Sequence, residues 1–411
     1  MNPIRRWLDD AKTPPNLRHV DTCDGLRAMA VMIVAWFHIW QQSWLYPGFD
    51  LFGRSVNLDP LVRSGYIWVD MMILISGFCL YMPWARMRYE GGSVPCVRDF
   101  YARRLMRIQP SYLLTIAVMF IVALATNAYY SREHMLRDLF SHLTYTHMFF
   151  YDAYYASNLG GALWTLAVEM QFYLVFPLLA RAFYKLPATT FAVMTAFSLA
   201  FRGWVGATLE DVSLYFNQFP AYLDTFAIGM ACAAIHAHLA QKKPGAFRRI
   251  LCSAGSVLML ALLWQVVRRQ AGNPNVEAIR LGQMSNRLTM GVLGGGLLLL
   301  SANAGLVVRR ILGNRVTRFL SAVSFQFYIW HQTIAVWLIQ HRVIPSEYEN
   351  PNWEGDERWQ LTYTIACFAV SLIAAAALTY GFERPIARAL QKRYDARKGA
   401  KQAKKARKKG N

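Results

Sequence analysis

The chain has 411 residues, of which 55% are hydrophobic and only 17% are charged. Soluble domains carry about 25% charged residues, so this composition argues against an ordinary soluble protein. The formal net charge of +20 could suit nucleic acid, but the basic residues are spread between apolar stretches, and we expect no nucleic-acid partner. The six cysteines have no metal-ligand spacing, so neither a disulfide framework nor a metal site is predicted.

Ten apolar stretches are predicted to cross a bilayer as helices, because spanning the hydrocarbon takes about 20 mostly apolar residues. The stretches lie near 22–44, 66–84, 110–128, 160–181, 187–206, 219–239, 250–267, 288–306, 319–340 and 359–381. The predicted fold class is therefore all-α integral membrane, a bundle of about ten transmembrane helices. We expect a multi-pass protein of the cell (inner or plasma) membrane, in contact with membrane lipids.

The basic residues between these stretches predict the orientation of the chain. With the N-terminus inside, 32 of the 44 Lys and Arg residues fall in inside segments, as the positive-inside rule requires. Both termini are therefore expected in the cytoplasm. The chain divides into a cytoplasmic N-terminal segment (1–21), a membrane domain (22–384) and a basic cytoplasmic tail (385–411). We expect the tail to be disordered, because its end is rich in Lys, Arg, Ala and Gly and has no apolar face to bury.

The first span carries two ionisable residues, Arg27 and His38, on one helical stripe. Eleven residues at about 100° each bring them within about 20° of the same face, roughly 16 Å apart along the axis. Histidine can take and return a proton near neutral pH, so His38 is the predicted general base. Arg27 cannot lose its proton and is expected to anchor a phosphate or a carboxylate. The residues alone equally allow an Asp24–Arg27 ion pair and a structural His38.

Carboxylates also lie inside candidate spans, where an ionisable group costs about 2.5 to 3.5 kcal/mol to insert. Glu169 follows Trp164 in the fourth span, and Asp70 lies in the second. Glu169 could orient or charge-stabilise His38, hydrogen-bond an acceptor, or form a structural hydrogen bond to another helix. These three roles stay open at the level of sequence.

The ninth span holds a second intramembrane histidine, His331, next to Trp330 and close to Tyr328. By itself such a histidine is more often a packing residue than a catalyst. After the tenth span, Glu383 and Arg384 precede a proline, and this charged pair is interpreted as a structural lock at a helix end.

Three arginines, Arg103, Arg104 and Arg107, lie among large apolar residues just before the third span. Arginine forks bind phosphate oxygens bidentately, and an interfacial helix would hold them at the inner mouth of the bundle. The alternative is that these arginines only anchor the topology and bind lipid headgroups.

Seven segments that contain these residues follow one another in a specific order. They are DGLRAMAVMIVAWFH (24–38), WVDMMILISGFCL (68–80), FYARRLMRIQPSY (100–112), WTLAVEMQFYLVFPLL (164–179), YLDTFAIGMA (222–231), SFQFYIWHQTI (324–334) and FERP (382–385). In that order they resemble the acyltransferase-3 family of polytopic membrane acyltransferases. The resemblance covers most of the chain, from about 24 to 385.

The resemblance implies an acyltransferase that takes an acyl group, usually acetyl, from coenzyme A on the cytoplasmic side. The acceptor it implies is a hydroxyl of a carbohydrate or glycolipid, and no metal is required. The family motifs match Arg27 and His38, the arginine cluster, and the pairs Trp164 with Glu169 and Trp330 with His331. We assign catalysis to His38, Glu169 and Arg27, donor binding to Arg103, Arg104, Arg107 and Trp164, and acceptor binding to Asp70, Tyr328, Trp330 and His331.

Two departures from the family pattern limit what can be carried over. Met71 and Met72 stand where the family usually has paired phenylalanines. Some members also carry a fused extracytoplasmic hydrolase-like domain, whereas this chain is expected to end in the cytoplasm and to deliver the acyl group itself or to a separate partner.

Direct transfer is favoured over a covalent acyl-enzyme on His38, Ser76 or Cys79, because spacing puts no base beside these nucleophiles. The alternative from another functional class is a glycan or lipid transporter or flippase with an intramembrane proton relay. Transporters often contain internal repeats with matched broken helices, and the sequence has none that we can identify. The acyltransferase is therefore the preferred hypothesis.

Overall fold

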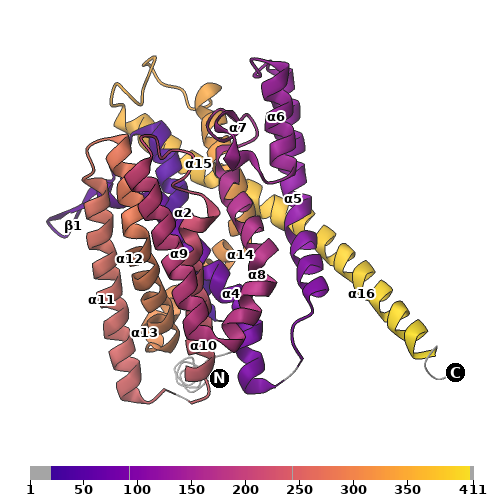
Figure 1. Ribbon diagram of the computed structural model, residues 1–411. Coiled ribbons are helices and arrows are strands. Elements are labelled where there is room, and N and C mark those ends of the chain that lie inside the picture. The colour runs from indigo at the N-terminus through magenta and orange to yellow at the C-terminus, as the bar shows by residue number, and fades with distance from the viewer. Residues whose placement is uncertain (1–19, 92, 243, 408–411) are drawn as a thin grey trace, which may run out of the picture.

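The computed structural model describes residues 20–91, 93–242 and 244–407, the last seven of them as backbone only. Within these ranges the chain is almost entirely helical (Figure 1). The helices are α2 (Asp21–Ser43), α3 (Asp59–Arg63), α4 (Val69–Glu90), α5 (Val97–Ala125), α6 (Arg132–Leu143), α7 (Tyr151–Tyr155), α8 (Trp164–Lys185), α9 (Pro187–Thr208), α10 (Leu223–Leu239), α11 (Ala246–Ala271), α12 (Val276–Asn303), α13 (Leu306–Leu312), α14 (Arg315–Gln340), α15 (Glu357–Leu378) and α16 (Arg384–Arg407). A small antiparallel hairpin, β1 (Gly48–Leu51) and β2 (Arg54–Asn57), follows α2.

Each predicted span overlaps one long helix, in order α2, α4, α5, α8, α9, α10, α11, α12, α14 and α15. By length and hydropathy, six helices of the described chain could cross a membrane outright, or up to seven if the bent pair formed by α12 and α13–α14 counts as one span. The all-α membrane fold class is confirmed, while the count of ten spans and the cytoplasmic termini stay predictions.

The arginine cluster does not sit on a separate interfacial helix. Instead, α5 runs without a break from Val97 to Ala125 and includes both the arginines and the apolar third stretch. Pro110 lies inside it and does not end it. The arginines therefore belong to the same continuous helix as the apolar residues of the third predicted span.

Helix α4 packs most extensively against α10, and glycines allow the two backbones to approach closely. A Cβ atom added at Gly77 would lie 2.5 Å from the carbonyl oxygen of Phe226, and one at Gly229 would lie 2.1 Å from that of Leu74. Small residues at such contacts are typical of membrane helix pairs. This close packing fixes the position of α4, other residues of which line the candidate site.

Two buried ion pairs join four helices beside this contact. The Nε atom of Arg287 on α12 lies 3.3 Å from Asp70 on α4, and Arg202 on α9 lies 2.6 Å from Asp224 on α10. The guanidinium of Arg287 also stacks on the ring of Tyr222, 3.7 Å from its centroid. Buried charges are costly unless they are paired. Each charged residue of the two pairs therefore accounts for the burial of its partner.

The basic tail departs from the expectation of disorder, because Arg384–Arg407 forms helix α16. A π-helical turn, η5 (Thr379–Glu383), connects it to α15, and Figure 1 shows α16 projecting beyond the bundle. Near the bundle, Asp99 of α5 accepts hydrogen bonds from Tyr394 (2.8 Å) and Lys398 (2.5 Å). The composition of the tail alone cannot predict these bonds, because they depend on a residue of α5. Positions 1–19 of the predicted N-terminal segment (1–21) lie outside the described residues.

Candidate active site

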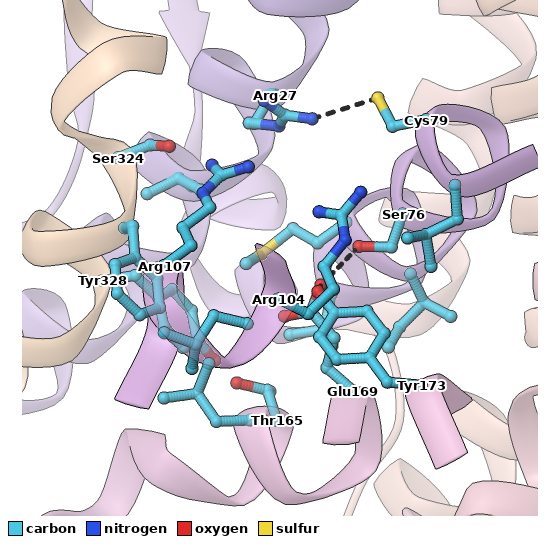
Figure 2. Close-up of a pocket in the computed structure, with 18 residues that line it drawn as sticks. Arg27, Ser76, Cys79, Arg104, Arg107, Thr165, Glu169, Tyr173, Ser324 and Tyr328 are labelled. Atoms are coloured by element: carbon cyan, nitrogen blue, oxygen red, sulfur yellow. Dashed lines mark hydrogen bonds between the residues drawn. The ribbon is translucent and has the colours of Figure 1, made fainter. Parts of the chain in front are cut away.

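A pocket of about 270 Å³ opens among α2, α4, α5, α8 and α14, and we call it the arginine pocket. Its charged residues are Arg27, Arg104, Arg107 and Glu169. Figure 2 shows the three guanidinium groups around one space, each contributed by α2 or α5. The other polar side chains that line it are those of Ser76, Cys79, Thr165, Tyr173, Ser324 and Tyr328.

The arginines of this pocket are held mainly by contacts with sulfur and aromatic groups and not by ion pairs. Arg27 donates a hydrogen bond to the sulfur of Cys79 (3.3 Å), and the guanidinium of Arg104 lies 5.6 Å from the ring centroid of Tyr173. In the part of the chain that the structure describes, no carboxylate lies within 4.0 Å of Arg104 or Arg107. With three arginines and one carboxylate in its wall, the pocket is suited to an anion.

Arg103 does not take part in this arrangement, although sequence reasoning grouped it with Arg104 and Arg107. Its side chain is exposed, and it is not among the residues that line the pocket. Arg104 and Arg107 are three positions apart and share a helix face, but Arg103 lies four positions before Arg107 and is also close to that face. Helix geometry alone therefore does not predict that Arg103 lies outside the pocket.

Glu169 contacts a different partner from the one that its spacing suggested. One of its oxygens, Oε1, accepts hydrogen bonds from Ser76 Oγ (2.9 Å) and from the hydroxyl of Tyr173 (2.5 Å). Among the described residues no hydrogen bond joins Glu169 to His38. The geometry agrees with the structural alternative, a bond to a neighbouring helix, and it places a negative charge beside the arginines.

A second cavity, of about 740 Å³, contains His38, and we call it the histidine cavity. Its wall is rich in aromatic rings and carries amide side chains between them. The aromatic residues are Phe37, Trp40, Trp44, Tyr66, Tyr154, Tyr155, Trp164, Phe216 and Tyr328, and the amides are Gln41, Asn217, Gln270, Asn273 and Gln283. Trp164, predicted to bind the donor with the arginines, lies in this cavity instead.

His38 has a defined hydrogen-bonding partner in this cavity. Its Nδ1 atom lies 3.1 Å from Oε1 of Gln41, and in the neutral ring this contact is a hydrogen bond when the proton is on Nδ1. The Nε2 atom then carries the lone pair that a general base needs. Gln41 was not identified from the sequence, although its position three residues after His38 puts it on the same helix face.

His331 is adjacent to His38, with 5.3 Å between the ring centroids. It is fully buried, and its Nδ1 atom donates to the carbonyl oxygen of Tyr328 (2.9 Å). Its Nε2 atom has no hydrogen-bond partner among the described residues. The structure thus brings both predicted histidines together, with the lone pair of each on Nε2.

The arginine pocket and the histidine cavity share two wall residues, Val69 and Tyr328. Arg27 and His38 lie on one helix as predicted, but they line different cavities because of their separation along the axis. Tyr328 is almost fully buried between the two spaces. The site therefore consists of two chambers with a thin common wall.

Three of the four residues assigned to acceptor binding lie outside both chambers. Asp70 is occupied by its ion pair with Arg287, and neither Trp330 nor His331 is among the residues that line either space. Within the described ranges no group of three His, Cys, Asp or Glu side chains could hold a metal ion. The side chains that line the two spaces include arginine, histidine, carboxylate, hydroxyl and thiol groups.

Comparison with known proteins assigns the chain to a family. The sequence model of a family described as an acyltransferase domain, Acyl_transf_3, matches residues 21–380. A protein of Staphylococcus aureus (strain COL), named "Putative O-acetyltransferase SACOL0978", is 23% identical over 346 residues, 77% of this chain and 50% of its own. The peptidoglycan O-acetyltransferase OatA of Listeria monocytogenes is 22% identical over 338 residues, 77% of this chain and 49% of its own.

Nodulation protein 10 of Rhizobium leguminosarum bv. viciae is 29% identical over 217 residues, which cover 49% of this chain and 54% of that protein. The chain thus spans about half the length of the curated relatives that it matches. No solved structure matches. Because the family model covers nearly the whole helical bundle, the chain belongs to the acyltransferase-3 family.

Proposed function

We propose that the protein is a multi-pass membrane O-acyltransferase. It takes an acyl group, acetyl in the first instance, from acyl-coenzyme A and transfers it to a hydroxyl of a cell-envelope or exported carbohydrate. The observation that carries the proposal is the pair of chambers of opposite character that meet at Tyr328. Family membership and the names of the relatives OatA and SACOL0978 support the same reaction class.

The arginine pocket is the donor side of this proposal. Arg27, Arg104 and Arg107 would attract the phosphates of a coenzyme A thioester by charge-assisted hydrogen bonds, with the acyl arm extending towards Tyr328. The positive-inside rule assigns α5 and its arginines to the cytoplasmic face. This is the side on which acyl-coenzyme A is available.

The histidine cavity is the acceptor side. Flat aromatic faces next to amide groups suit a sugar ring, which has apolar C–H faces and hydroxyl edges. Its two arginines already have acidic partners, since Arg63 lies 3.1 Å from Asp59 and Arg280 lies 3.5 Å from Asp211. The cavity is thus suited to an uncharged part of a carbohydrate or glycolipid.

The reaction then proceeds at the common wall. His38 Nε2 removes the proton of an acceptor hydroxyl while the hydroxyl oxygen attacks the thioester carbonyl. The C–S bond breaks, the acceptor keeps the acyl group as an ester, and the thiolate of coenzyme A receives a proton from the imidazolium. The Tyr328 hydroxyl, in the wall of both chambers, can donate to the oxygen that becomes negative. Gln41 holds the ring of His38 in its tautomer.

The proposal is tested with membranes that contain the protein and acetyl-coenzyme A labelled in the acetyl group. Label is expected in a carbohydrate or glycolipid, released as acetate by mild alkali because it is held as an ester. Uptake or flipping of a glycan with no labelled acceptor would contradict the proposal and favour the transporter alternative.

A further inference from the structure

A third cavity, of about 430 Å³, adjoins the arginine pocket at the start of α16, and we call it the α16 cavity. Arg27 and Arg107 line both spaces, so the two meet at these side chains. Arg318 of α14 and Arg384 and Arg388 of α16 complete the basic part of its wall. Sequence reasoning assigned no ligand to these last three arginines.

The wall of the α16 cavity has an excess of positive charge. Five arginines face two carboxylates, those of Asp24 and Glu383. Both carboxylates are already engaged, because Asp24 accepts a hydrogen bond from Ser321 (3.0 Å) and Glu383 accepts one from Gln326 (2.9 Å). Among the described residues no carboxylate lies within 4.0 Å of Arg318, Arg384 or Arg388.

The arginines of α16 are held in place by the fold. Asp99 of α5 binds Tyr394 and Lys398 further along α16, and the guanidinium of Arg384 stacks on Tyr380, 4.5 Å from the ring centroid. The π-helical turn η5 lies directly before Arg384, and such turns are frequent at functional sites. The helix thus fixes Arg384 and Arg388 at one side of a basic cavity.

We infer that the α16 cavity binds the phosphate groups of a nucleotide-bearing donor, with Arg318 and Arg388 as phosphate-binding residues. The inference rests on the proposed function. A coenzyme A thioester has a long, uncharged arm and a multiply phosphorylated nucleotide end. The arm extends through the arginine pocket towards Tyr328, and the phosphates nearest to the arm lie at Arg27, Arg104 and Arg107. The rest of the nucleotide end then lies in the larger basic space on the other side of Arg27 and Arg107.

The binding experiment uses the full chain in nanodiscs of phosphatidylcholine alone and compares coenzyme A with dephospho-coenzyme A, which lacks the 3′-phosphate. The variants are Arg318→Gln, Arg388→Gln and the double variant. Arg393→Gln is the matched control, since it makes the same charge change on α16 at an exposed position about 140° around the helix from Arg388. Wild-type transfer of labelled acetyl is measured in parallel.

We expect each single variant to bind coenzyme A about tenfold more weakly, because each would lose a charge-assisted phosphate contact. The double variant should lose more, and Arg393→Gln should bind like the wild type. If either arginine contacts the 3′-phosphate, its replacement will cost less affinity for dephospho-coenzyme A. An equal loss for both ligands assigns that arginine to the diphosphate.

Unchanged coenzyme A affinity in the double variant, with wild-type binding and transfer intact, would overturn this inference and leave the proposed function standing. A wild type that neither binds coenzyme A nor transfers acetyl would overturn both. The same phosphate chemistry is available from anionic lipids, so discs containing phosphatidylglycerol form a second arm. If the variants lose only retention of that lipid, the cavity is a headgroup site and the inference is wrong.

Discussion

His38 and Gln41 form the smallest unit of the proposed chemistry, a base and the amide that orients it. When the proton of the neutral His38 ring is on Nδ1, it is donated to Oε1 of Gln41 (3.1 Å), and Nε2 is the basic atom of the ring. His331 is close enough to compete for the role, but its buried ring lines neither chamber. The distinction between the two histidines is therefore testable at single positions.

His38→Ala should reduce acetyl transfer by about 10² to 10⁴-fold, the usual contribution of a general base. Binding of coenzyme A should be unchanged, because His38 lines the histidine cavity, which is the proposed acceptor side. Transfer rate and coenzyme A affinity are measured on the same preparation, beside His331→Ala. Near-normal transfer by His38→Ala, or a larger loss in His331→Ala, would show that His38 is not the base.

Gln41→Ala should lower kcat for transfer by about tenfold and leave the KM for the donor unchanged, because the ring of His38 loses its orientation and not its basicity. Gln41→Glu, which keeps an acceptor oxygen at the same reach, should restore part of the rate. A raised donor KM with unchanged kcat would argue against an orienting role.

Individual residues show how far the sequence alone could be used. The spacing of Arg27 and His38 on one stripe and the anionic preference of Arg104 and Arg107 follow from helix geometry and charge. The division of one stripe between two chambers does not, because it depends on side chains of other helices, Val69 of α4 and Tyr328 of α14, that form the wall between the chambers. Glu169 and Asp70 were assigned to chemistry because each is a carboxylate in an apolar helix, and their actual partners, Ser76 and Arg287, lie 93 and 217 residues away.

At the scale of elements, α5 shows that neighbouring arginines of one helix can differ in whether they line the pocket. Arg104 and Arg107 line it and Arg103 does not, although the three look equivalent in the sequence. The tail is a second example at this scale. Helix α16 makes hydrogen bonds to α5 that the composition of the tail does not predict.

Arg104→Gln or Arg107→Gln should raise the donor KM by about tenfold or more, the equivalent of one charge-assisted hydrogen bond of about 1.5 to 3 kcal/mol. Arg103→Gln serves as the control and should leave it unchanged. The KM is measured in a transfer assay at saturating acceptor. Equal effects at all three positions would favour a general electrostatic role for the cluster.

The α4–α10 contact gives a prediction on stability. Gly229→Ala should destabilise the protein by about 1 to 3 kcal/mol, because the new Cβ would meet the backbone of Leu74 and force the helices apart. Gly203→Ala on α9, where nothing lies within 4 Å of an added Cβ, should unfold at or slightly above the wild-type temperature. Thermal unfolding in detergent compares the two, and equal unfolding temperatures would contradict the close packing.

The whole molecule has a proposed orientation, with α5 and α16 at the cytoplasmic face, and Cys96 reports on it. Cys96 is exposed in the loop before α5, whereas the other cysteines are buried or partly buried. A membrane-impermeant thiol reagent should therefore label it only after the cells are permeabilised. In a Cys96→Ser background, Glu354→Cys, in an exposed loop between α14 and α15, should be labelled in intact cells. The reverse pattern would invert the topology and remove the donor from its arginines.

The shared wall at Val69 and Tyr328 has an electrical consequence for the proposed reaction. The charged nucleotide stays on one side of the wall and the carbohydrate on the other, so only the acyl group moves outward. Because the acceptor's proton passes through His38 to the departing thiolate, a proton moves inward in exchange for an acyl cation equivalent. The two displacements cancel, and the membrane potential, which does about 2.3 kcal/mol of work per charge per 100 mV, would neither drive nor oppose the transfer.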